Sequence, residues 1–88
     1  MIKDYERESE MLKALAHPVR LKMAEGLVSN ECNVNKIVSK LGLPQSTISQ
    51  HLSILRSRGI VKARKEGLKT CYKVDNPKVA EIVKILGR

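Results

Sequence analysis

A run of small polar side chains between residues 46 and 59, STISQHLSILRSRG, stands where an exposed helix would ordinarily carry Glu and Lys. At about 100° per residue, Ile48, Leu52 and Leu55 fall on one apolar face that would seat the helix on a core. The opposite arc is uncharged and free of bulky groups, and it consists of Ser46, Ser49, Gln50, Ser53 and Ser57. Hydroxyl and amide groups hydrogen-bond to base edges, and Gln can pair bidentately with adenine. The arc therefore favours a helix that enters a DNA major groove over the alternative, a helix buried on both sides.

Positive charge is concentrated around the same segment. The formal net charge is +8, and the stretch 56–73 holds seven basic residues and one acid. Arg56 and Arg58 come at the carboxyl end of the predicted helix, where its dipole favours cations and backbone phosphates are within reach. Charge of this size on a small surface indicates a polyanionic partner. The sequence has no Ser-His-Asp set, paired carboxylates or phosphate-binding loop, so we expect no enzyme activity.

Three short helices are predicted ahead of this segment. The first covers residues 4–16 and ends at His17-Pro18, because Pro18 disfavours a helical His17 but suits the first position of the next helix. The second covers residues 18–28. The third covers residues 33–41 and stops at Gly42.

The remaining residues predict a β-hairpin and a last helix. Residues 60–74 alternate between apolar and basic side chains and bend at 65–68, where Gly67 can take a positive φ. In the second strand the expected apolar face consists of Leu68, Thr70, Tyr72 and Val74. Such a hairpin directly after a groove-fitting helix is typical of a wing, whose basic tip would contact phosphate or the minor groove. The last helix, residues 77–86, is capped by Asn76-Pro77.

The apolar stripes of the first and last helices exceed what the core of so short a chain can cover. Pairing both stripes across a two-fold axis is the economical arrangement, so we expect a homodimer through the first and last helices. The predicted interface consists of Met11, Leu12, Leu15, Val79, Ile82, Val83 and Leu86.

Length and composition limit the chain to one small domain. We expect residues 1–88 to form a single winged helix-turn-helix domain, mainly α with a small β-wing. Two Tyr and no Trp or Phe argue against an aromatic cage, a base-stacking platform or a haem pocket. The apolar runs are far shorter than the roughly 20 residues that span a bilayer, and the start, MIKDYERESE, does not read as a secretory signal. We therefore expect a cytoplasmic protein with no membrane partner.

Two longer segments resemble a known family. LKALAHPVRLKMAEGL and LGLPQSTISQHLSILRSRGIVKARKEGLKTCYKV resemble the ArsR/SmtB family of bacterial winged helix-turn-helix repressors, over about residues 12–74. The resemblance implies a homodimer on an inverted-repeat operator, with two recognition helices about 34 Å apart. The positions that match the family's DNA-reading residues are Gln45, Ser46, Thr47, Ser49, Gln50 and His51, to which the helix pattern adds Ser53 and Arg56. The family's wing contacts fall on Arg64, Lys65, Gly67 and Lys69.

The chain departs from this family at both of the family's usual metal sites. Metal-sensing members often carry two thiolates before the third helix, where this sequence has Asn33 and Asn35, and neutral Asn does not replace thiolate for soft ions. No His follows Asp75, so the second site, along the last helix, is missing too. We interpret His17 as the residue before a helix and His51 as a DNA-contacting or packing residue, and we expect no metal and no cofactor.

Two cysteines, Cys32 and Cys71, remain to be interpreted. In a cytosolic protein the ordinary interpretation is two reduced thiols without a role. Cys71 lies between two lysines and Cys32 precedes a predicted helix, and both settings favour thiolate. The alternative hypothesis is that oxidation joins the two cysteines or modifies one of them, which would move the wing relative to the recognition helix.

The sequence therefore predicts a dimeric, sequence-specific DNA-binding repressor of the ArsR type that lacks the usual metal sites, with thiol redox control as a further hypothesis. The alternative function is a winged-helix protein-interaction module whose basic charge is incidental. The uncharged arc argues against that alternative, and a flat salt dependence of DNA binding would favour it.

Overall fold

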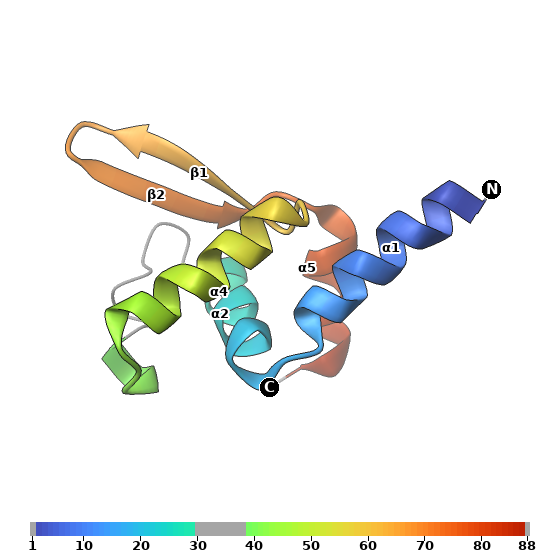
Figure 1. The fold of residues 1–88 in the computed structure, drawn as a ribbon, viewed down its shortest axis with the longest axis horizontal. Helices are drawn as coiled ribbons and strands as arrows, with labels where there is room; N and C mark the ends of the chain where they lie inside the picture. Colours follow the sequence, from blue (N-terminus) through green and yellow to red (C-terminus); the bar gives the residue numbers. More distant parts are fainter. Residues whose placement is uncertain (1, 30–38, 88) are drawn as a thin grey trace.

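The computed structural model describes residues 2–29 and 39–87 as helices around a small core, with one projecting hairpin (Figure 1). The elements in chain order are α1 (Ile2–Leu15), α2 (Pro18–Ser29), α4 (Gln45–Ser57), β1 (Val61–Glu66), β2 (Lys69–Val74) and α5 (Pro77–Leu86). Of the predicted third helix, residues 39–41 are described; they are helical, and Gly42 follows them with a φ of 65°. The radius of gyration of 12.8 Å is close to the roughly 12 Å of a compact chain of this length.

The turn between α1 and α2 has the predicted His17-Pro18 pair at its end. Pro18 is the first residue of α2, a position where its missing N–H and fixed φ cost nothing. The backbone N–H of Val19 donates to Nδ1 of His17 at 3.1 Å, so the imidazole caps the start of the helix. The interpretation of His17 as a residue that begins a helix agrees with this contact.

Helix α4 lies on the core through the predicted apolar stripe, since Ile48, Leu52 and Leu55 are all buried. Its carboxyl end is closed by Gly59, whose φ is 72°. The N–H of Gly59 donates to Arg56 O at 3.1 Å, and the N–H of Ile60 donates to Leu55 O at 2.9 Å. These two bonds form a Schellman motif, which turns the chain directly from the helix into the hairpin.

One apolar cluster joins all the described elements except the distal part of the hairpin. Its buried members are Met11, Ala14, Leu15, Met23, Ala24, Leu27, Ile48, Leu52, Leu55, Ile60, Val61, Val79 and Val83. No polar or charged side chain among residues 2–29 and 39–87 is buried. The core therefore uses aliphatic packing alone, as the near absence of aromatic residues requires.

The hairpin pairs β1 with β2 in antiparallel register, with Val61 opposite Val74 and Glu66 opposite Lys69. Gly67 turns the chain with a φ of 64°, as predicted. The predicted apolar face of β2 is wrong at its distal end, because Leu68 is fully exposed in the turn and Thr70 is exposed as well. Cys71, which strict alternation would place opposite that apolar face together with Lys69 and Lys73, is buried instead. The base of the hairpin packs against α2 and the distal half projects beyond the body, so burial follows that boundary rather than strict alternation.

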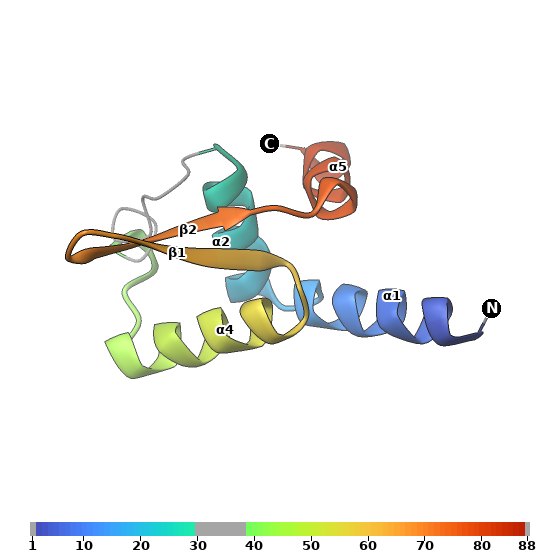
Figure 2. The same cartoon turned by 90° about the horizontal axis from the view of Figure 1, so that it is seen from above.

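The two ends of the molecule differ in composition and shape. Seen from above, the wing tip and the amino end of α4 extend to one side, while α1 and α5 lie at the other (Figure 2).

Asn76 caps α5 by accepting from the N–H of Lys78 at 3.0 Å, as predicted. Glu8 of α1 pairs with Lys78 of α5 at 2.6 Å, a contact that also raises the pKa of Lys78.

Candidate nucleic-acid interface

The predicted DNA-reading residues of α4 lie together on the surface of that helix. Ile48, Leu52 and Leu55 occupy the core side, so the polar arc is turned outwards. The exposed members are Gln45, Ser46, Ser49, Gln50, Ser53 and Arg56, whereas Thr47 and His51 are half-buried at the edges of the arc. No carboxylate lies on this helix, so nothing on it would repel phosphate. The face has the size and chemistry that major-groove readout needs.

Two details of α4 were not anticipated from the sequence. Ile54 lies on the outer side next to the arc and is 37% exposed, so one bulky apolar residue borders the arc. An exposed apolar group at this place can contact a thymine methyl. Ser57, counted in the arc, donates its hydroxyl to Ile54 O at 2.9 Å. A helical wheel that placed every residue of the segment, and not only its polar ones, would have identified Ile54.

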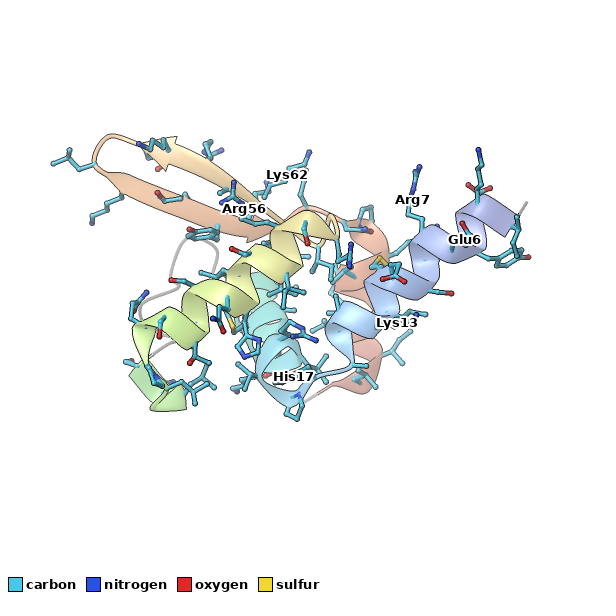
Figure 3. The ribbon with its side chains drawn as sticks, in the orientation of Figure 1. Glu6, Arg7, Lys13, His17, Arg56 and Lys62 are labelled. Atoms are coloured by element: carbon cyan, nitrogen blue, oxygen red, sulfur yellow. The ribbon has the colours of Figure 1, made fainter. Side chains whose placement is uncertain are left out.

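Some cationic side chains of the wing are paired with carboxylates, and others are exposed near its tip. Lys62 pairs with Asp75 at 2.9 Å, which lowers the pKa of that carboxyl, and Arg64 pairs with Glu66. Lys65 and Lys69 flank Gly67 near the tip and are exposed. Side chains such as Lys62 extend away from the body (Figure 3). The wing residues predicted to contact DNA, Arg64, Lys65, Gly67 and Lys69, therefore all lie on its exposed distal half.

The wing and the amino half of α4 project from the same side of the molecule in both ribbon views (Figures 1 and 2). The Schellman turn at Gly59 and Ile60 connects them rigidly, and β1 packs against α4. A surface that combines an uncharged, hydrogen-bonding helix with a cationic hairpin is suited to a groove and the phosphates beside it. Arg58, beyond the end of α4, is directed to Glu10 of α1 at 3.6 Å.

His51 lies where α4 meets α2. Its Nδ1 is 3.3 Å from Nη1 of Arg20, and its ring centroid is 4.7 Å from that of His17. Partial burial lowers the pKa of His51, and the charges of His17 and Arg20 lower it further. Figure 3 shows His17 at the turn between α1 and α2. His51 thus contacts protein neighbours at the edge of the predicted DNA-reading face.

The predicted dimer residues divide into two groups in the structure. Met11, Leu15, Val79 and Val83 are buried in this chain's own core, so their assignment to a subunit surface is revised. Leu12 and Leu86 are exposed and Ile82 is half-buried. Further exposed apolar side chains on the same two helices are Ile2, Tyr5 and Ile85. The sequence could not separate core from surface here, because both groups lie on the same apolar side of each helix.

Two hollows accompany these apolar side chains. One, of about 610 Å³, lies between α1 and α5 and is lined by residues such as Tyr5, Leu12 and Ile82. The other, of about 560 Å³, lies between the α1–α2 turn and α5 and includes Leu21 and Leu86. Both hollows are on the α1 and α5 end of the molecule, away from the wing.

The remaining predicted sites concern cysteines and metals. Cys71 is buried and disulfide-bonded. Cys32, Asn33 and Asn35 lie outside the described residues. Within residues 2–29 and 39–87, no three His, Cys, Asp or Glu side chains are grouped so that they could hold a metal ion. No helix in those ranges is long and apolar enough to cross a bilayer.

Comparison with known proteins places residues 17–63, from His17 to the first wing strand, in a family described as bacterial regulatory protein, arsR family. The transcriptional repressor PagR of Bacillus anthracis is 44% identical over 82 residues, 92% of this chain and 82% of PagR. The biofilm growth-associated repressor of Xylella fastidiosa is 37% identical over 78 residues, 89% of this chain and 68% of the relative. The transcriptional activator HlyU of Vibrio cholerae is 38% identical over 78 residues, 89% of this chain and 72% of HlyU.

Solved structures of two of these relatives have the same fold. The crystal structure of PagR superimposes with a TM-score of 0.87 at 41% identity, covering 98% of this chain and 99% of PagR. The structure of HlyU from Vibrio cholerae superimposes with a TM-score of 0.88 at 36% identity, covering 98% of this chain and 94% of HlyU. The predicted winged helix-turn-helix architecture is thereby confirmed.

Proposed function

The chain belongs to the ArsR family of bacterial regulatory proteins, and on this premise we propose that it binds an inverted-repeat operator as a homodimer. It is a DNA-binding transcriptional repressor and not an enzyme, in keeping with relatives such as PagR. Each subunit inserts α4 into a major groove and lays its wing on the adjacent backbone. The two recognition helices then lie about 34 Å apart, one turn of B-DNA. A bacterial repressor acts on the genome, which lies in the cytoplasm, so we propose a cytoplasmic location.

The exposed face of α4 is the observation that carries this proposal. Seven of the thirteen residues between Gln45 and Ser57 are Ser, Thr or Gln, and no acidic residue is among them. Arg56 at the end of the helix and Lys65 and Lys69 on the wing supply charge at the margins of this face. Uncharged groups in the centre read base edges, while cations at the margins bind phosphate.

The dimer is supported by the apolar surface of α1 and α5. Tyr5 is 67% exposed, Ile85 is 79% exposed and Leu86 is 59% exposed. Exposed apolar side chains that gather on neighbouring helices mark interaction sites in soluble proteins. A second copy of the chain is the partner we propose, because an operator with two-fold symmetry requires a protein with the same symmetry.

Selection from a randomised duplex pool, followed by fluorescence anisotropy on the selected site, tests this function. We expect an inverted repeat whose half-sites are about one helical turn apart. Binding should be at least about a thousandfold tighter than to a scrambled duplex and should weaken steeply with salt. Equal affinity for both duplexes, or a flat salt response, would instead favour a protein-interaction module.

A second candidate function, thiol control of the repressor, is favoured by the disulfide at Cys71. Cys71 is opposite Arg64 in the hairpin, so its bonding state bears directly on the wing. We propose that a peroxide oxidises the Cys32 and Cys71 thiols to one disulfide. The two thiols lose two electrons and two protons, and one peroxide molecule becomes two water molecules.

Anisotropy on reduced and peroxide-treated protein, with intact mass for both samples, tests thiol control. We expect the oxidised protein to be lighter by two hydrogens and to bind the operator with altered affinity, and dithiothreitol should reverse both changes. Cys71→Ser, which cannot form the bond, should not respond to peroxide. Identical operator affinity in the reduced and oxidised proteins would refute thiol control and leave the repressor function standing.

A further inference from the structure

His51 lies where the middle of the recognition helix, α4, contacts a charged side chain of α2, Arg20. Arg20, from α2, donates twice in different directions. Its Nε donates to Ala14 O, near the end of α1, at 2.6 Å, and its Nη1 is 3.3 Å from Nδ1 of His51 on α4. Arg20 therefore links α1, α2 and α4 through one guanidinium group.

The chemistry of the donors decides the state of both imidazole rings. Arg has five N–H donors and no acceptor, so the Arg20–His51 hydrogen bond requires a lone pair on Nδ1 of His51. The backbone N–H of Val19 likewise can only donate, so Nδ1 of His17 also carries a lone pair. The His51 ring is then neutral with its proton on Nε2. A protonated ring has N–H on both nitrogens and cannot accept either bond.

Protonation of His51 would do more than remove one hydrogen bond. The groups that face it from the neighbouring elements are Arg20 on α2 and His17 on the α1–α2 turn, and both act against a positive ring. Half-burial of His51 acts in the same direction. Loss of the contact would leave an imidazolium beside a guanidinium and would remove this hydrogen bond between α4 and α2.

We propose that Arg20 positions the recognition helix through neutral His51, so that operator binding weakens as the medium becomes acidic. The inference rests on the proposed function, because it concerns the helix that reads the operator. His51 is next to Gln50, whose side chain is exposed on the DNA face. A small rotation of α4 at this contact therefore moves a base-reading side chain directly.

The sign of the pH dependence separates this role from a direct DNA contact. If His51 bound a phosphate, its protonation would add a cation and strengthen operator binding in acid. If His51 accepts a hydrogen bond from Arg20, only the fraction of the protein with a neutral His51 is competent to bind the operator. The apparent dissociation constant then rises about tenfold for each pH unit below the pKa of His51.

Operator affinity measured by anisotropy between pH 5.0 and 8.0 at constant ionic strength tests the proposal. His51→Asn is the informative variant, because its side-chain oxygen replaces Nδ1 as an acceptor but does not titrate. We expect operator binding by His51→Asn to lose the acid weakening, whatever its affinity at pH 8. The matched control, His17→Asn, keeps a capping acceptor for the N–H of Val19 and should retain the acid weakening, because the Arg20–His51 contact is unchanged.

Imidazole ¹⁵N chemical shifts of the free protein provide a second readout that needs no DNA. At pH 8 they should show His51 protonated on Nε2 and not on Nδ1. Wild-type binding that is independent of pH, binding that strengthens in acid, or a proton on Nδ1 would each overturn the positioning role and leave the repressor function intact. Absence of operator binding at every pH would overturn both.

Discussion

At the scale of single residues, the interface separates side chains that are free to meet DNA from side chains that already have a partner. Gln50 and Lys65 are both exposed. Ser57, by contrast, bonds to its own helix, and Lys62 is paired with Asp75. Residues of one type can therefore have different effects on DNA binding, and the difference is measurable.

Gln50→Ala should weaken operator binding by about 1–3 kcal/mol and should relax the preference at one base pair, because it removes a bidentate base contact. Anisotropy against operators substituted at single positions measures both effects. Ser57→Ala is the matched control and should change the affinity little, because its hydroxyl is directed to Ile54 O. If Gln50→Ala has no effect on any operator, α4 does not enter the groove as proposed.

Lys65→Ala should weaken binding to all sequences alike and make the slope of log affinity against log salt shallower by about one. The reason is that a phosphate contact releases a counterion but reads no base. Titrations of operator and scrambled duplexes at four salt concentrations give the slope. Lys62→Ala, which removes a cation paired with Asp75, should change the slope less, and the opposite order would move the DNA contact to the base of the wing.

At the scale of elements, α4 is held at three places, and each restricts a different motion. The Ile48, Leu52 and Leu55 face seats it on the core. The Schellman motif at Gly59 sets the angle at which the chain leaves α4 for the wing. The Arg20–His51 contact restrains rotation at the middle of the helix. The exposed Arg58–Glu10 pair adds little, since ion pairs in water are weak.

Gly59→Ala should lower the free energy of unfolding by about 1–2 kcal/mol, because an L side chain is disfavoured at a φ of 72°. No atom lies within 4 Å of the added Cβ, so the cost comes from the backbone alone. Urea titrations followed by circular dichroism measure the change. Gly59→Asn should lose less of the free energy of unfolding than Gly59→Ala, since Asn tolerates this conformation. An equal loss in both variants would show that side-chain size, and not backbone strain, decides the loss of stability.

At the scale of the whole molecule, the two surfaces lie at opposite ends. The wing tip and the amino end of α4 form the cationic end, and α1 and α5 form the apolar end (Figure 2). This separation allows two chains to join through one end while both present the other to DNA. In the proposed dimer, the half-site spacing then depends on how the second copy is oriented at the apolar end.

Leu12→Glu should yield a folded monomer whose operator affinity falls sharply, because Leu12 is 49% exposed on α1 and the two half-sites would then be bound independently. Sedimentation velocity measures the association state. Val79→Glu should unfold the chain instead, because Val79 has no exposed surface and an unpaired charge would be buried. A Leu12→Glu protein that remains dimeric would place the interface elsewhere.

The sequence by itself determined the elements and the polar face of the recognition helix. Local chemistry explains why: His17-Pro18, Gly59, Gly67 and Asn76 set helix and turn boundaries through preferences that act over a few residues. The helical period placed Ile48, Leu52 and Leu55 on the core without knowledge of what covers them. The family resemblance rested on the same segments.

Only the tertiary structure decided which apolar residues are core and which remain exposed. Leu12 and Leu15 share one side of α1, yet Leu15 is 4% exposed and Leu12 is 49% exposed, because burial depends on the position of α5 and α4. Cys71 is buried and Leu68 is exposed for the same kind of reason, since the hairpin leaves the body partway along. The Arg20–His51 contact joins residues 31 positions apart. Periodicity describes one element at a time, and such contacts exist only when several elements have been packed together.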